Sequence, residues 1–109
     1  MSAEPRPYRH SPIFDAGNLP AALTRTHMTK AGVWAKIEII EGRLRYRAEG
    51  EPAQMLTPGR PGLIRPQQPH SVAIEDAATR FRIAFYDRLP DMDEATQVED
   101  RRGSGEGGQ

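Results

Sequence analysis

The feature that most constrains the fold is the alternation of apolar residues in the middle of the chain. In "VWAKIEIIE", residues 33–41, every second position from Val33 to Ile39 is apolar. A period of two places these side chains on one face of a strand. No segment of about a dozen residues keeps the 3.6-residue period of an amphipathic helix. The sequence therefore predicts an all-β domain.

Further short segments of strand character follow, and proline and glycine separate them. Glu41-Gly42 predicts a tight turn, with a positive φ at Gly42, that joins residues 33–41 and 43–47 as a hairpin. Pro58, Pro61, Pro66 and Pro69 lie between the apolar segments, where a missing amide hydrogen breaks no ladder. Many short strands with little helix indicate an antiparallel sandwich or barrel. The other predicted strands are residues 54–57, 62–65, 70–74 and 79–86.

The two ends of the chain differ in composition from the middle. Residues 1–7 carry two prolines and no apolar period, so they predict a flexible arm before a domain over residues 8–89. Residues 90–109 are rich in acidic residues and Gly, and they predict a disordered tail. The glycines near the C-terminus follow no strand and open no helix, so no nucleotide site is expected there.

Charge and cysteine content narrow the class of protein. The 109 residues carry 15 Lys plus Arg against 15 Asp plus Glu, so no charge excess favours nucleic acid or an acidic membrane as a partner. Cysteine is absent, and the N-terminus lacks the apolar stretch of a signal peptide. We therefore expect a cytoplasmic protein. A domain of this size buries only a small core. Trp34 alternates with the apolar positions of residues 33–41, so it is expected on the outer face of the strand, where a large apolar side chain often marks a protein contact. A homodimer is therefore an alternative to a monomer, and sedimentation would test it.

Arginines occupy alternate positions in residues 43–47, "RLRYR". In a strand, Arg43, Arg45 and Arg47 share one face. That face is either a solvated strand surface or an anion-binding patch, and the sequence leaves both open.

Two histidines are candidates for a site. His70 opens a predicted strand on the same side as Val72 and Ile74, so it points inward if that side is the interior. His27 lies shortly before residues 33–41. An inward imidazole is a metal ligand, a hydrogen-bonding group or a general base. Catalytic metal sites normally take three protein ligands, and His10 is a third candidate if the N-terminal arm folds over the mouth of the barrel.

The order of these landmarks resembles a known family. The pieces that carry the resemblance run from about Tyr8 to Leu89 and are similar to the TehB/YeaR-like family of small cupin domains, linked by name to tellurite resistance. They are Ser11-Pro12-x-Phe14, Leu19-Pro20, His27-x-Thr29-Lys30-x-Gly32-Val33-Trp34, Glu41-Gly42, Pro66-x-x-x-His70 and Phe81-x-Ile83-x-Phe85-Tyr86.

The resemblance implies a single cupin-type double-stranded β-helix, a jelly-roll barrel with its site at the mouth. The segment from Gly62 to His70 is similar to the second cupin motif, so the role of metal ligand maps onto His70. His27 takes one histidine position of the first motif. Thr29 or Lys30 stands where a second histidine is usual, and the usual glutamate position is not acidic. The resemblance thus implies a divalent transition metal such as zinc, iron or nickel on His27 and His70.

Longer relatives in this family join the module to a methyltransferase domain that uses S-adenosylmethionine. That domain needs a glycine-rich strand-turn-helix and well over about 100 further residues. Neither is present in the 109 residues. We expect no bound S-adenosylmethionine and no methyltransferase activity.

Three functions remain as alternatives. The first is a small-molecule or oxyanion binding module in tellurite or other stress resistance. The second is a metal-dependent cupin enzyme that uses His27 and His70. The third is a dimeric accessory protein with a vestigial pocket, in which His27→Ala leaves cellular function intact. For the first, cationic and hydrogen-donating groups favour an anion, and the expected lining is Arg25, His27, Lys30 and His70.

Overall fold

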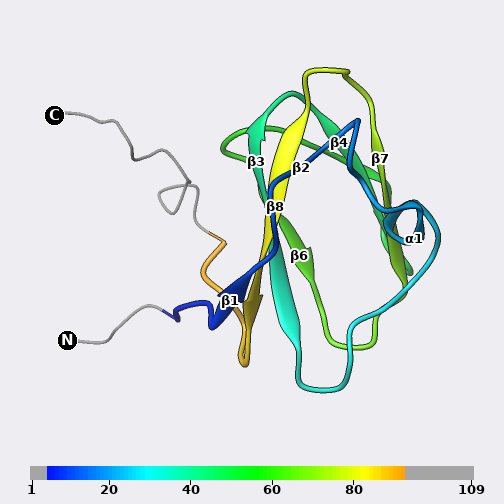
Figure 1. Ribbon diagram of the computed structural model, residues 1–109. Coiled ribbons are helices and arrows are strands. Elements are labelled where there is room, and N and C mark those ends of the chain that lie inside the picture. Colours follow the sequence, from blue (N-terminus) through cyan, green and yellow to red (C-terminus); the bar gives the residue numbers. More distant parts are fainter. Residues whose placement is uncertain (1–4, 93–109) are drawn as a thin grey trace, which may run out of the picture.

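Strands make up nearly all the regular structure in the computed structural model, which describes residues 5–92 (Figure 1). Residues 1–4 of the predicted arm and 93–109 of the predicted tail lie outside the described residues. No helix within residues 5–92 is long and apolar enough to span a membrane. The elements are β1 (Arg9–His10), β2 (Phe14–Asp15), α1 (Ala21–Thr24), β3 (Trp34–Glu41), β4 (Leu44–Ala48), β5 (Gln54–Leu56), β6 (Gly62–Ile64), β7 (His70–Ile74) and β8 (Arg80–Tyr86).

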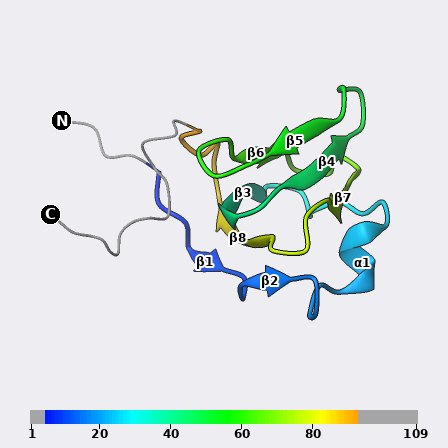
Figure 2. The same cartoon turned by 90° about the horizontal axis from the view of Figure 1, so that it is seen from above.

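The strands form two antiparallel sheets with one core between them. One sheet has the order β1-β8-β3-β6, with β2 also paired to β8, and the other has the order β5-β4-β7. Figure 2 shows β4 and β5 on one side of β3 and β8, with β1 and β2 on the other. Ile37, Phe81, Leu44 and Tyr46 from the two sheets belong to the same buried cluster. The all-β prediction is confirmed, and the strands of residues 5–92 form two sheets that do not close into a barrel.

The predicted alternation fixes which residues enter this core. Ala35 and Ile37 of β3 have no exposed surface, and Ile39 is 6% exposed. In β4, Leu44, Tyr46 and Ala48 are buried, whereas the arginines between them face outward. The period-two reading of these strands is therefore confirmed.

The predicted hairpin at Glu41-Gly42 is wrong. Gly42 has the expected positive φ of 85°, but β3 pairs with β6 and β8, whereas β4 pairs with β5 and β7. A register shift between Ile39 and Glu41 bends the end of β3, and the chain crosses from one sheet to the other at Gly42. Thr79 holds this crossing, because its Oγ1 accepts from the Arg43 amide at 2.9 Å and donates to the Arg43 carbonyl at 2.8 Å.

The outer face of the five-stranded sheet is covered. Lys36 and Glu38 point away from the core, yet they are only 2% and 8% exposed. Lys36 Nζ donates to the Asp91 carbonyl at 2.8 Å, and Pro90 is buried. Residues 90 and 91, which the sequence placed in the tail, thus pack on the sheet.

Tyr46 supports a prediction about the link between the two sheets. Its hydroxyl donates to the Leu63 carbonyl at 2.6 Å, and burial raises its pKa to about 12. Tyr46→Phe is expected to lower the free energy of unfolding by about 1–2 kcal/mol, because the part-buried hydrogen bond to the Leu63 carbonyl is lost. Urea unfolding of both proteins measures this. An unchanged midpoint would show that water replaces the hydroxyl.

Candidate functional site

His27 and His70 lie in direct contact. A two-residue antiparallel bridge joins them, with the His27 amide donating to the His70 carbonyl at 2.9 Å and the His70 amide donating to the His27 carbonyl at 2.8 Å. Their ring centroids are 4.2 Å apart at an interplanar angle of 61°. The bridge lies at the first residue of β7, on the edge of that strand that does not pair with β4. The structure therefore brings together the two histidines that the sequence singled out.

Each ring has its tautomer fixed by a hydrogen bond to a backbone carbonyl two residues earlier in the chain. Nδ1 of His27 lies 2.9 Å from the Arg25 carbonyl, and Nδ1 of His70 lies 2.8 Å from the Gln68 carbonyl. A carbonyl oxygen only accepts, so each Nδ1 carries the hydrogen. In the neutral form of each ring, Nε2 then offers a lone pair to a proton, a hydrogen-bond donor or a metal ion.

The turn before His70 holds an unusual backbone. Gln67 has φ of 60°, and among non-glycine residues in the described range it alone has a positive φ. Its amide donates to the Thr29 carbonyl at 3.1 Å. This turn presents the next carbonyl, that of Gln68, to the His70 ring. Strained backbone of this kind is concentrated at functional sites.

His70 is buried, whereas His27 is partly exposed. The His70 ring lies 6.1 Å from the Tyr46 ring and is 4% exposed. Burial lowers the pKa of His70 below its ordinary value of 6.5; the hydrogen bond to the Gln68 carbonyl opposes this, and the neighbouring His27 adds to it. The imidazole of His70 therefore favours its neutral form.

This burial predicts how stability depends on pH. As pH falls through 6.5, the unfolded chain takes up a proton on His70 before the folded protein does. The free energy of unfolding is thus expected to be highest above pH 6.5 and to fall as pH drops toward the lower, folded pKa. Urea unfolding between pH 5 and 8, with an NMR titration of the ring protons, measures both quantities.

His70→Gln is the control for this dependence, and the variant should show a flatter pH profile. His10→Gln is also needed, because burial and Arg82 lower the pKa of His10 and act in the same direction. A His70 midpoint at or above 6.5 would contradict the prediction.

The other predicted site residues lie apart from this pair. The Arg25 carbonyl contacts His27, but the Arg25 side chain is exposed. Lys30 is exposed, and its backbone carbonyl accepts from the Val33 amide at 3.1 Å. His10 pairs with Ala84 in the opposite sheet, so it does not approach the pair.

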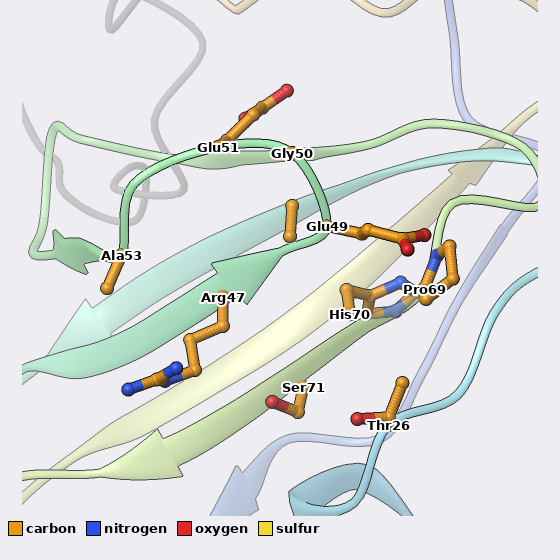
Figure 3. Close-up of a pocket in the computed structure, with 10 residues that line it drawn as sticks. Thr26, Arg47, Glu49, Gly50, Glu51, Ala53, Pro69, His70 and Ser71 are labelled. Carbon is orange, nitrogen blue, oxygen red and sulfur yellow. The ribbon is translucent and has the colours of Figure 1, made fainter.

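A cavity of about 430 Å³ adjoins His70 at the end of the three-stranded sheet (Figure 3). Arg47 lies opposite Ser71 in the β4–β7 ladder, and the His27–His70 bridge places Thr26 on the same outer face as Ser71. The alternation in residues 43–47 predicted that Arg47 lies on the same strand face as Arg43 and Arg45, but it did not predict that Ser71 and Thr26 lie beside it. The lining is Thr26, Arg47, Ala48, Glu49, Gly50, Glu51, Ala53, Pro69, His70 and Ser71.

The cavity mixes charges of both signs. Glu51 is paired with Arg65 at 2.8 Å, and Gln68 Nε2 donates to the backbone carbonyl of Glu49 at 2.9 Å. On the arginine face of β4, Arg45 is paired with Glu75 at 2.8 Å. Arg47 on the same face is exposed and lines the cavity.

The residues present supply only part of a metal site. Two imidazoles with Nε2 lone pairs are suitable ligands, but within residues 5–92 no group of three or more His, Cys, Asp or Glu side chains could hold a metal ion. A catalytic zinc site normally has three protein ligands. The two histidines therefore do not by themselves complete a catalytic metal site.

Comparisons with known proteins agree with the fold. The family model of the TehB-like domain matches residues 9–83. The crystal structure of TehB from Haemophilus influenzae is similar, with a TM-score of 0.70 and 26% identity over 79% of this chain and 32% of TehB. A protein from Escherichia coli strain K12 is similar in fold, with a TM-score of 0.69 and 18% identity over 84% of this chain and 97% of that protein. The chain spans about a third of the length of TehB, and no curated protein matches it significantly.

Proposed function

The chain belongs to the TehB-like domain family, and from this premise we propose that it is a small-molecule or oxyanion binding module linked to tellurite or other stress resistance. Its ligand occupies the 430 Å³ cavity beside His70. The observation that carries this proposal is that one cavity is lined by His70, by the Arg47 guanidinium and by two hydroxyl-bearing residues, Ser71 and Thr26. A cavity of this volume is within the range of small-molecule sites.

The cation of this site is Arg47 rather than the predicted Lys30 or Arg25. Arg47 lines the cavity, and neither of the other two does. A guanidinium beside hydroxyl groups binds carboxylates and oxyanions through charge-assisted hydrogen bonds. His27 contacts the His70 ring but does not line the cavity.

Calorimetry with tellurite, nitrite, sulfate and simple carboxylates tests the proposal. At least one of these ligands is expected to bind, and Arg47→Met should weaken that binding about tenfold or more. Arg43→Met is the matched control, because Arg43 is an exposed arginine directly before β4 that does not line the cavity. Absence of heat with every ligand at millimolar concentration would contradict the proposal.

The second candidate is a metal-dependent enzyme with a zinc, iron or nickel ion on His27 and His70. The contact of the two rings and their Nδ1–carbonyl bonds favour it, because metal-ligating histidines usually donate the other ring N–H in this way. Elemental analysis of protein purified without a histidine tag tests it. Stoichiometric metal that is lost in His70→Ala supports this candidate, and less than about a tenth of an equivalent after supplementation counts against it.

Other parts of the proposal rest on the sequence and on the family resemblance. The cupin-type jelly roll, the cytoplasmic location and the lack of methyltransferase activity remain predictions for this chain. The activity of full-length TehB is likewise not carried over, because the chain matches 32% of that protein. A homodimer stays a proposal that sedimentation at several concentrations would test.

A further inference from the structure

The polar side chains of the cavity beside His70 separate into a donor group and an acceptor group. Arg47, Ser71 and Thr26 form the donor group on the outer face of the three-stranded sheet. Glu49 is the acceptor, and in Figure 3 its carboxylate lies on the other side of His70 from Ser71 and Thr26. The cavity therefore has a positive wall and a negative wall.

None of these side chains is engaged by the rest of the described chain. Within residues 5–92, no hydrogen bond or ion pair is formed by the Arg47 guanidinium, the Glu49 carboxylate or the hydroxyls of Ser71 and Thr26. Arg47 and Glu49 line the same cavity but do not pair with each other. Glu51, by contrast, is neutralised by Arg65.

The charge balance of the lining disfavours a bare anion. Arg47 is the one cation among the lining residues, and Glu49 is the lining carboxylate that no cation within residues 5–92 pairs with. An anion held by Arg47 would also experience the field of the Glu49 carboxylate, which no cation within residues 5–92 compensates. A ligand with its own positive group removes this repulsion and adds a second charge-assisted contact.

We propose that the cavity beside His70 binds a small zwitterion, with its anionic group against Arg47, Ser71 and Thr26 and its ammonium group against Glu49. This inference rests on the proposed function and specifies the ligand class of the same site. A compact amino acid is the chemistry that matches two opposite charges on separate walls of a cavity of about 430 Å³.

Calorimetry with matched pairs of ligands tests the inference. Glycine, β-alanine and γ-aminobutyrate vary the spacing of the two charges, and acetate, propionate and butyrate lack the ammonium group. At least one zwitterion is expected to bind about tenfold more tightly than its matched carboxylate. Glu49→Gln should remove this advantage, and Arg47→Met should weaken both ligands of the pair. Arg43→Met is the control, and thermal unfolding confirms that each variant is folded.

The outcomes separate the inference from the proposed function. One outcome overturns the inference but leaves the proposed binding module intact. In that outcome an oxyanion binds, Glu49→Gln tightens its binding, and none of the zwitterions binds. If neither zwitterions, carboxylates nor oxyanions bind at millimolar concentration, both are overturned. If a zwitterion binds and its affinity does not change in Glu49→Gln, the assignment of the ammonium group to Glu49 is wrong.

Discussion

Gly42→Ala is expected to lower the free energy of unfolding by about 3–5 kcal/mol, because it adds a steric clash to a left-handed backbone. A Cβ at position 42 would lie 2.4 Å from both Cα and Oγ1 of Thr79, and φ is 85°. The Thr79 backbone cannot move aside without losing the two hydrogen bonds between its hydroxyl and Arg43. Urea unfolding monitored by the fluorescence of Trp34 measures the loss.

Gly50→Ala is the matched control for this prediction. Gly50 has the same φ of 85°, but a Cβ there would meet no atom within 4 Å. The control isolates the cost of the left-handed backbone, about 1–2 kcal/mol. Equal losses in the two variants would show that the close approach of Thr79 to Gly42 contributes nothing to stability.

Arg82→Met is expected to lower the free energy of unfolding by about 2–4 kcal/mol, because it leaves a carboxylate buried without its cation. Arg82 Nε lies 2.7 Å from Glu38 Oε1, and the two side chains are 29% and 9% exposed. Chemical unfolding at pH 7 measures the change. The double variant Arg82→Met, Glu38→Leu should recover much of the loss, since it removes the unpaired charge.

Arg80→Met provides the comparison on the same strand. Arg80 pairs with Glu41 of β3 at 3.0 Å, but both side chains are nearly half exposed. Solvent screens that pair, so its removal should cost within about 1 kcal/mol. If Arg82→Met and Arg80→Met cost the same, burial of Glu38 does not strengthen its ion pair.

Alternation predicted the strands well because each residue's face depends only on its own segment. Residues 70–74 match β7 as predicted, and residues 33–41 match β3 except for Val33. The N-terminal elements were missed, since β1 and β2 have two residues each and no period can appear in two residues. The alternation within a segment also does not indicate which strands pair with each other. The hairpin predicted at Gly42 was wrong for this reason, because β3 and β4 pair with strands that are distant in sequence.

The histidine pair could be anticipated, but the cavity could not. His27 and His70 stood out as rare residues at the edges of strands, and a resemblance to cupins linked them. Nothing in the sequence around Thr26 and Ser71 indicated a role in a site. They lie beside Arg47 only because β4 and β7 pair in a particular register and because His27 pairs with His70. The burial of Lys36 likewise depends on where residues 90 and 91 pack, which no pattern within β3 indicates.

The crossing of the chain at Gly42 has a consequence for synthesis on the ribosome. Because β3 does not pair with β4, its longest ladder must wait for β8, whose first residue follows the end of β3 by 39 positions. Long-range pairing of this kind makes folding slow, on the order of milliseconds to seconds. The five-stranded sheet, and with it the core that buries His70, is therefore completed only after residue 86 has left the exit tunnel, so the cavity beside His70 takes its final shape only once β8 has emerged.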